Sequence, residues 1–297
     1  MFVWSKLSDA RWNDAWEERF HALVGTSLVL TEFPSKPTVR VEVFCRSEEQ
    51  ATDIKAQFGG KVSHLADRDW VAFSGHEPAP TKIRDRFLVT PAHDPARLAA
   101  IAAENPGRSC ISIPAEMAFG TGDHATTATC LRLLCDLHAR GELPAGFSCL
   151  DLGCGSGILA IAAAKLGAAT VCGLDFDPAA VRISKKNAGA NGVAGKASFE
   201  EADILQWLPE PATRSYDLIF ANLFSDVLQA AFPTIRRAMA PGGHLVLSGI
   251  LGAHAPETFA SAAGAGLHVE ETRPRGKWVT AHATTSTPER PQAARRV

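Results

Sequence analysis

The sequence lacks the features that would place the protein in a membrane or give it a general affinity for polyanions. No apolar run reaches the roughly 18 residues that a membrane-spanning helix requires, so we expect no membrane association. The 30 basic and 32 acidic side chains leave a formal net charge of −2, which is too small to favour direct binding to nucleic acid. The residues after Met1 are polar and tryptophan-rich, unlike a signal peptide, which predicts a cytoplasmic protein.

Cysteine is present, but its pattern excludes the common structural uses of the residue. The seven cysteines are an odd number, and no two form a C-x-x-C pair. Several lie in apolar strand or helix patterns, where cysteine packs as a small hydrophobic residue. We therefore expect neither disulfides nor a metal site, and reduced thiols again indicate the cytoplasm.

The length of 297 residues, with 46% hydrophobic and 21% charged residues, is sufficient for two globular domains. The order of the periodic segments predicts a small first domain over residues 1–65 and a linker over residues 66–109. The linker is expected to contain a strand at residues 87–90 and a short helix at residues 97–104. A larger α/β domain follows over residues 110–283. Residues 284–297 are rich in Ser, Thr, Pro and Arg and are expected to form a disordered tail.

The first predicted domain alternates strand and helix patterns in the order β-α-β-β-α-β. The strand patterns cover residues 2–7, 27–31, 39–44 and 61–65, and the helical patterns cover residues 9–23 and 47–58. This order predicts a ferredoxin-like plait. The segment contains no catalytic constellation, so we expect either a recognition module or a purely structural domain.

The second domain is organised around residues 149–157, which read Cys-Leu-Asp-Leu-Gly-Cys-Gly-Ser-Gly. An apolar run, closely spaced glycines and an Ala-rich helical pattern predict a strand, a tight loop and a helix. Gly153, Gly155 and Gly157 have no Cβ, so the backbone can approach a ligand closely, beside the free N–H groups of the helix. The next strand ends in Asp175, about twenty positions later, where a carboxylate can bind a ribose diol. A nucleoside cofactor is therefore predicted.

The identity of that cofactor is left open by the glycine pattern alone. The segment from Gly155 to Ala160 satisfies the dinucleotide pattern G-x-G-x-x-A, and a glycine-rich turn without a ligand is a further alternative. Asp151 stands just before the loop, where it would repel a pyrophosphate but attract a sulfonium and an ammonium group. This acid favours S-adenosylmethionine (AdoMet).

A second candidate loop lies at residues 119–127, Phe-Gly-Thr-Gly-Asp-His-Ala-Thr-Thr, immediately before a helical pattern. Two glycines, three threonines and a histidine within nine residues suit a loop that faces a ligand. An elaborate helix cap is an equal alternative, because Asp123 and Thr126 are both suited to capping. His124 is more readily explained as a capping or packed histidine than as a general base.

The rest of the domain continues to alternate strands and helices. Strand patterns cover residues 197–200, 216–221 and 244–248, and helical patterns cover residues 178–191, 225–239 and 256–263. A last pair of strand patterns, 267–271 and 278–282, closes the domain. The pattern predicts a mostly parallel sheet covered by helices on both faces, with an antiparallel hairpin at one edge.

Three blocks of the sequence resemble one family of class I methyltransferases. They are Ala118 to Thr127, Leu150 to Ala163, and Ala221-Asn-Leu223 together with Pro241 to Ile250. The chain is similar in these blocks to the PrmA family, the methyltransferases of large-subunit ribosomal protein eleven. The predicted layout of plait, linker and catalytic domain also resembles that family. The resemblance implies a Rossmann-like AdoMet fold.

The resemblance also implies roles for individual residues. Thr127 would contact AdoMet, Gly153 and Gly155 would lie along its amino-acid end, and Asp175 would bind its ribose hydroxyls. Asn222 would lie beside the transferring methyl group, and Asp203 would face the adenine amine. The chain departs from the family's usual Asn-Ile-Leu-Ala, since it has Leu, Phe and Ser after Asn222.

The implied function is AdoMet-dependent N-methylation of lysine or α-amino groups on a large-subunit ribosomal protein, by a monomer. No side chain is assigned as a general base. The alternatives are a methyltransferase for another protein's lysines or for a small molecule, and a non-catalytic AdoMet-fold binding module.

Overall fold

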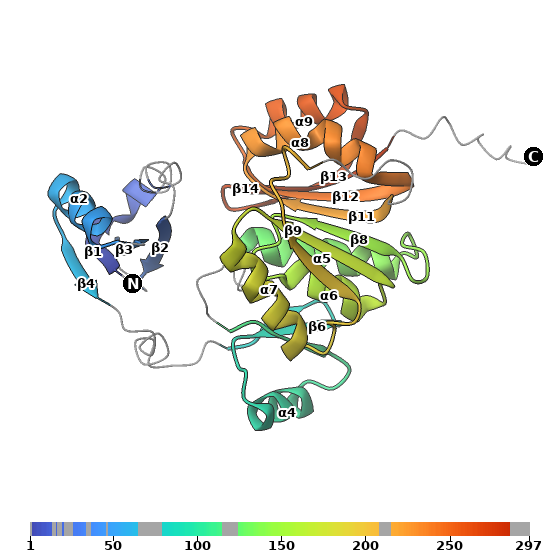
Figure 1. Ribbon diagram of the computed structural model, residues 1–297, viewed down its shortest axis with the longest axis horizontal. Helices are drawn as coiled ribbons and strands as arrows, with labels where there is room; N and C mark the ends of the chain where they lie inside the picture. The colour runs from blue at the N-terminus through green and yellow to red at the C-terminus, as the bar shows by residue number, and fades with distance from the viewer. Residues whose placement is uncertain are drawn as a thin grey trace, which may run out of the picture. The chain divides into compact units, whose positions relative to one another are not determined.

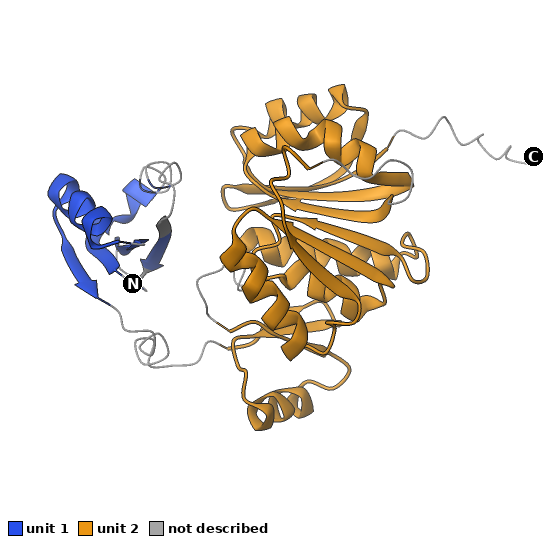
Figure 2. Ribbon diagram, viewed as in Figure 1, with its two compact units in different colours: residues 1–76 blue, residues 77–297 orange. Residues whose placement is uncertain are grey.

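The computed structural model describes residues 2–13, 16, 20, 26–33, 37–45, 47–64, 79–114, 124–207 and 215–285. The chain folds as two compact units, residues 1–76 and residues 77–297 (Figure 2). Each unit contains a hydrophobic core of its own. Within the described ranges, no helix has the length and apolar character needed to cross a membrane.

The first unit is built on an antiparallel sheet with the strand order β2-β3-β1-β4. Its strands are β1 (Phe2–Asp9), β2 (Thr26–Glu32), β3 (Thr38–Cys45) and β4 (Lys61–His64). The helix α2 (Glu48–Phe58) begins at Ser47, whose side chain accepts a hydrogen bond from the backbone N–H of Gln50. This strand order is that of the predicted ferredoxin-like plait. The predicted helix over residues 9–23 falls mostly outside the described residues, apart from the 3-10 helix η1 (Ala10–Trp12) at its start.

An aromatic cluster forms the core of this unit on one face of the sheet. Trp4 is fully buried, and its ring centroid lies 5.7 Å from Phe20 and 6.2 Å from Phe58. The Trp4 indole Nε1–H donates to the Gly59 carbonyl at 2.5 Å, so its polar atom is also satisfied. Leu7 and Val29 point to the opposite face of the sheet, where they are 60% and 39% exposed.

Part of the predicted linker is folded into the second unit. Residues 79–109 supply most of a three-stranded sheet with the order β5-β6-β7 and a helix. These elements are β5 (Thr81–Ile83), β6 (Phe87–Thr90), α4 (Pro95–Glu104) and β7 (Ser109–Ser112). Ile83, Phe87 and Val89 are buried in the same hydrophobic cluster as helices of the catalytic domain. The second half of the predicted linker therefore belongs to the second unit, whose core it helps to cover.

The large sheet of the second unit has seven strands (Figure 1). In the order in which they lie side by side, they are β10 (Ala197–Glu201), β9 (Thr170–Asp175), β8 (Ser148–Leu152), β11 (Tyr216–Asn222), β12 (Met239–Leu251), β14 (Trp278–Thr285) and β13 (Leu267–Arg275). The first five are parallel, and β14 is antiparallel to both of its neighbours. The predicted parallel sheet with an antiparallel edge hairpin is confirmed. The last strand ends at Thr285, and the remainder of the predicted tail is outside the described residues.

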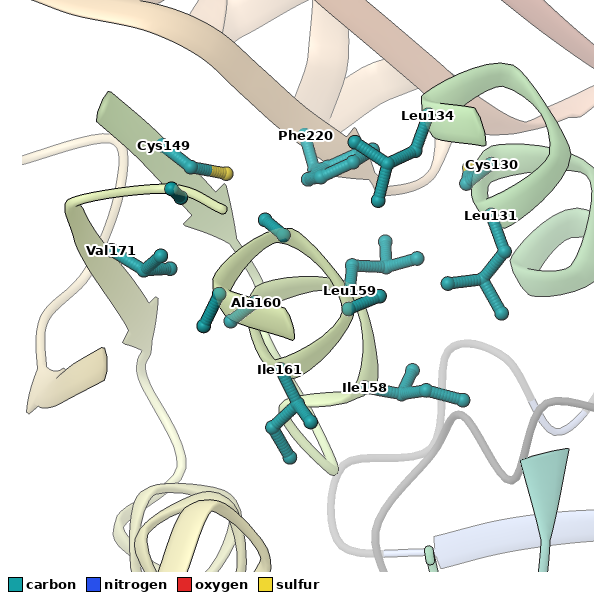
Figure 3. Packing of buried hydrophobic residues seen from close by; sticks show 14 of the residues in the cluster. Cys130, Leu131, Leu134, Cys149, Ile158, Leu159, Ala160, Ile161, Val171 and Phe220 are labelled. Carbon is teal, nitrogen blue, oxygen red and sulfur yellow. The ribbon is translucent and has the colours of Figure 1, made fainter. Parts of the chain in front are cut away.

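Helices cover both faces of this sheet (Figure 1). Side chains of α5 (Ala125–Ala139), α6 (Ile158–Leu166) and α7 (Pro178–Ala190) share one core cluster, and those of α8 (Ser225–Ala238) and α9 (Ala255–Gly264) share another. Figure 3 shows Leu134 of α5 and Leu159 of α6 in the first core, with Phe220 of β11. All seven cysteines are free thiols, and six are buried, as expected of small hydrophobic residues.

Candidate functional site

The predicted site residues converge where the strand order changes direction. Strand β8 has β9 on one side and β11 on the other, so the helices that follow β8 and β11 lie on opposite faces of the sheet. In open α/β sheets, ligands bind at the carboxyl ends of the strands at such a switch point. Gly153 follows β8, Asp175 ends β9 and Asn222 ends β11, so all three lie at this edge.

The glycine loop folds back over the end of β9. The backbone N–H groups of Gly153 and Cys154 donate to the Leu174 carbonyl at 2.8 and 3.0 Å. Gly153 has a φ of 68°, and a Cβ added there would lie 2.5 Å from the Leu223 side chain. The backbone conformation therefore favours glycine at this position, and a Cβ would also require the Leu223 side chain to move.

Asp175 organises the loop from the neighbouring strand. Its Oδ2 accepts a hydrogen bond from the Gly155 N–H at 2.9 Å, and its Oδ1 accepts one from the Asp177 N–H at 3.0 Å. Burial raises the pKa of this carboxyl, and these two backbone bonds oppose the increase. Each carboxylate oxygen can accept a further hydrogen bond, which two ribose hydroxyls could supply.

Asp151 lies beneath the loop and caps the helix that follows it. Gly157, the N-cap residue of α6, has no side chain, and Asp151 Oδ2 instead accepts the Ala160 N–H at 3.1 Å. Burial, and secondarily the charge of Asp175, raise the pKa of Asp151 to about 7, although the Ala160 bond opposes this. A cation bound at the loop would favour the ionised carboxylate. The sequence predicted the preference for a cation but not the capping role.

The start of α5 meets the end of β11. His124 is the N-cap of α5, and its Nδ1 lies 2.7 Å from Thr126 Oγ1 and accepts the Thr126 N–H at 3.4 Å. Asn222 donates from Nδ2 to the same hydroxyl at 3.4 Å. The interpretation of His124 as a capping histidine is therefore confirmed, and Thr126 is not the cap. Residues 119–123, which include Asp123, lie outside the described residues. The contact with Asn222 brings this segment to the cofactor edge.

Thr127 and Asp203 occupy different environments at this edge. Thr127 is 1% exposed, and its Oγ1 has no hydrogen-bond partner among the residues that the structure describes. Asp203 is exposed, with Leu205 N–H donating to Oδ1 at 2.9 Å and the Gln206 side-chain amide donating to Oδ2 at 2.8 Å. It follows β10, beside Phe176, which follows β9 and is 76% exposed. No sequence motif marks Phe176 as a site residue.

A chain of amide side chains braces the glycine loop from behind. Asn187 on α7 donates to the Ser156 carbonyl at 2.9 Å, and Asn191 donates to the Asn187 carbonyl at the same distance. Asn191 also bonds both backbone groups of Ser112 on β7, at 3.0 and 2.8 Å. These residues support the loop without forming part of it, and sequence spacing alone does not reveal them.

This donor set fits AdoMet better than a dinucleotide. Gly153 and Gly155 turn the loop with positive φ angles and carry no side chain, Asp175 can bind a ribose, and the buried hydroxyl of Thr127 can bond a ligand. Asp151 is buried directly behind the loop, where an anion would oppose a pyrophosphate and favour a sulfonium or ammonium group.

Comparisons with known proteins agree with this assignment. The family model "Ribosomal protein L11 methyltransferase (PrmA)" matches residues 27–286. A ribosomal protein L11 methyltransferase from Pelotomaculum thermopropionicum is 38% identical over 239 residues, which cover 79% of this chain and 73% of that protein. The Brucella abortus (strain S19) protein of the same name is 34% identical over 270 residues, 88% of this chain and 90% of that protein.

A solved structure extends the likeness to three dimensions. The crystal structure of a ribosomal protein L11 methylase from Lactobacillus delbrueckii subsp. bulgaricus matches with a TM-score of 0.53 and 26% identity. It covers 60% of this chain and 86% of that chain. The resemblance predicted from three sequence blocks is thus confirmed. The chain belongs to the ribosomal protein L11 methyltransferase (PrmA) family, and it is an AdoMet-dependent methyltransferase.

Proposed function

We propose that this chain transfers methyl groups from AdoMet to lysine or α-amino groups of ribosomal protein L11. The observation that carries the proposal is the extent of the family match, which runs from residue 27 to residue 286 and so includes most of the first unit. The described cofactor edge supports it, because Asp175 holds the glycine loop through the Gly155 N–H and Asn222 is hydrogen-bonded to Thr126 at the start of α5. The free cysteines suit a reducing compartment, and we place the reaction in the cytoplasm.

We assign the cofactor's parts to particular residues. Gly153 and Gly155 would line the amino-acid end, and Asp175 would accept bonds from the ribose hydroxyls. Asp203 would accept from the adenine amine, with the exposed ring of Phe176 against the base. The Thr127 hydroxyl would supply a further bond. When bound, AdoMet supplies a methyl group activated by the positive charge on its sulfur.

Asn222 would align the attacking amine. Its Nδ2 is directed to Thr126, which leaves the side-chain Oδ1 as an acceptor for an N–H of the substrate. A lysine amine has a reference pKa of about 10.4 and must lose a proton before it attacks. Burial beside a positively charged sulfur disfavours the ammonium form on two counts, so alignment and exclusion of water supply most of what the reaction needs. His124 is engaged with Thr126, which makes it a positioning residue in this scheme.

The first unit would recognise the substrate protein. The sheet face opposite the aromatic core presents Leu7 and Val29, both partly exposed, on strands β1 and β2. Arg40 lies directly opposite Leu7 in the register, and Glu42 lies opposite Val29. Such a mixed apolar and charged face suits docking of a folded protein.

Leu223 and Phe224, which follow Asn222 and depart from the family's usual residues, would adapt the substrate side of the cofactor edge to this chain's acceptor.

A transfer reaction with purified components tests this proposal. The chain is incubated with AdoMet and unmethylated ribosomal protein L11, and mass spectrometry should show methyl groups added at specific amines. Asn222→Ala should lower kcat about 100-fold while AdoMet binding changes little, because alignment is lost but the cradle is not. Asp53→Ala, an exposed acid on α2, is the control and should leave both unchanged. Unmodified ribosomal protein L11 in a reaction whose enzyme binds AdoMet would refute the substrate assignment.

A further inference from the structure

Two buried histidines face each other far from the methyl-transfer edge. His244 lies near the start of β12, and His282 lies on β14, where it is paired with Val246. His244 Nδ1 and His282 Nε2 are 2.9 Å apart, and the side chains are on the face of the sheet that packs against α5. The register pairs His244 with Leu218 and pairs Ser248 with Asn222, so the histidines lie toward the opposite end of the strands from the cofactor.

A carboxylate completes the group. Glu142 follows α5, and one of its carboxylate oxygens lies within 4.8 Å of a ring nitrogen of each histidine; these two nitrogens are also within 4.8 Å of each other. Among the described residues, this is the one group of three potential ligands that is close enough to share a metal ion. The histidines are 9% and 4% exposed, whereas the Glu142 side chain is 35% exposed. The group is thus buried on one side and open on the other, which gives a metal ion a route of entry.

The hydrogen bonding already orients His244 as a metal ligand. Its Nε2 lies 3.2 Å from the Glu142 backbone carbonyl, which can only accept, so this nitrogen carries the hydrogen. The lone pair of the neutral ring is then on Nδ1, directed at His282. A backbone carbonyl that fixes the tautomer of a histidine is the usual outer partner of a metal-bound imidazole.

The Glu142 carboxylate keeps one oxygen for a ligand. The Arg140 Nε–H donates to Oε1 of Glu142 at 2.5 Å, which leaves Oε2 for another partner.

We propose that Glu142, His244 and His282 form a binding site for a divalent ion of the zinc class, with water as the fourth ligand. Two imidazole nitrogens, a carboxylate oxygen and an open position are a common zinc donor set. With Zn–N distances of about 2.0–2.1 Å in a tetrahedron, the two nitrogens would be roughly 3.3 Å apart, a few tenths more than the observed 2.9 Å. The metal replaces the hydrogen between the rings, and the His282 hydrogen moves to Nδ1, so the ring remains neutral.

The consequence of metal binding would be structural. The ion would join β12 and β14 to the loop after α5, at the end of the sheet that carries no cofactor residue. Sequence spacing does not indicate this site, because its ligands are about 100 and 40 residues apart and the usual cysteine spacings are absent.

Titration of the chelator-treated full-length chain with Zn²⁺ tests the proposal. Calorimetry should give one equivalent bound, and a 100-fold excess of free Zn²⁺ over the Kd should raise the Tm by roughly 4 °C, with no such effect from Mg²⁺. His282→Gln should weaken binding by more than about 100-fold, since loss of a ligand exceeds the loss of an outer partner. His93→Gln, an exposed histidine outside the group, should leave the affinity unchanged.

Substitution of the exposed ligand Glu142 tests the site even if a variant of a buried histidine fails to fold. Glu142→Gln is at the surface and should weaken Zn²⁺ binding about 10- to 100-fold while the Tm without metal stays near that of the parent chain. AdoMet affinity should be the same in the parent chain, in His282→Gln and in Glu142→Gln. Zn²⁺ binding that is equally tight in the parent chain and in both ligand variants, or absent from the parent, would overturn the proposal.

Discussion

Replacing Asp151 by asparagine should stabilise the protein near pH 8 and weaken its binding of AdoMet. The carboxyl is fully buried, and its pKa is raised from 3.8 to about 7. A raised folded-state pKa means that the folded chain holds this proton more tightly than the unfolded chain. The stabilising contribution is therefore complete below about pH 4 and is lost as the pH rises through about 7.

The size of the effect follows from the shift. Roughly three pKa units correspond to an ionisation cost on the order of 4 kcal/mol above pH 7. An asparagine side chain can still accept the Ala160 N–H, but its buried amide hydrogens have no assigned partner and cost about 1–3 kcal/mol. We expect a net gain of about 1–3 kcal/mol in the free energy of unfolding at pH 8, disappearing near pH 5.

The ligand should respond in the opposite sense. A cation at the glycine loop favours ionised Asp151, so the Kd of the parent chain for AdoMet should fall about 100-fold between pH 5 and pH 8. In Asp151→Asn the affinity at pH 8 should be about 10- to 100-fold weaker, with a much smaller pH dependence. The remaining dependence would come from Asp175, whose pKa is also raised, mainly by burial.

Calorimetric titration with AdoMet across this pH range, together with guanidinium unfolding at both ends, measures both effects. S-adenosylhomocysteine, which lacks the sulfonium charge, is a matched ligand and should show the weaker pH dependence. The reasoning would be refuted if the variant were less stable at pH 8 and bound AdoMet with the pH dependence of the parent.

Three further perturbations are predicted from single contacts. Gly153→Ala should weaken AdoMet binding at least about 10-fold. The alanine would have to adopt a left-handed φ, and its Cβ would displace the Leu223 side chain. Unchanged affinity in calorimetry would contradict this. Asp136→Ala should lower the free energy of unfolding by about 1–2 kcal/mol, because partly buried Arg273 loses one of its carboxylate partners and keeps Glu271. The more exposed pair with Arg84 is also lost and contributes little; a urea titration measures the sum. Asn187→Ala should weaken AdoMet binding by a few fold without preventing folding, because the Ser156 carbonyl loses the hydrogen bond that supports the glycine loop. A near-native circular dichroism spectrum together with unchanged AdoMet affinity would count against this supporting role.

The glycine region was predictable because its signals are local. Gly153 must adopt a positive φ, an apolar run precedes it, and an alanine-rich helix follows, so strand, loop and helix were each indicated by adjacent residues. Asp175 followed from the fixed geometry of a parallel strand pair. The capping role of Asp151 was missed, although an N-cap glycine without a side chain is a usable signal that another residue must bond the helix N–H groups.

The strand predicted at residues 87–90 and the helix predicted at residues 97–104 are present as β6 and α4, but their place in the second unit was missed because the evidence for it is not local. Strand β5 has three residues and is too short to show a periodicity. Ile83 and Phe87 are buried only because helices more than 40 residues away supply the rest of the core. Strand β12 was likewise predicted too short, over residues 244–248, since it begins at Met239 and its register with β11 shifts across Pro241 and the glycines after it.

The pairing of His244 with His282 and the contacts of Asn187 and Asn191 behind the glycine loop could not be predicted from local sequence either. His244 and His282 meet because β12 and β14 pair in one register, and a shift by a single residue would turn one ring to the other face of the sheet. Asn191 reaches Ser112 across 79 positions of sequence. Contacts of this kind depend on the assembled sheet and are not contained in the spacing of one segment.

Radiolabelled AdoMet transfer to ribosomes and free ribosomal proteins, prepared from cells that lack this gene, tests the central claim most directly. We expect label in one small protein of the large subunit, identified as ribosomal protein L11, and loss of that label when Asp175→Ala replaces the parent chain. Label in other proteins only, or none at all with a chain that binds AdoMet, would contradict it.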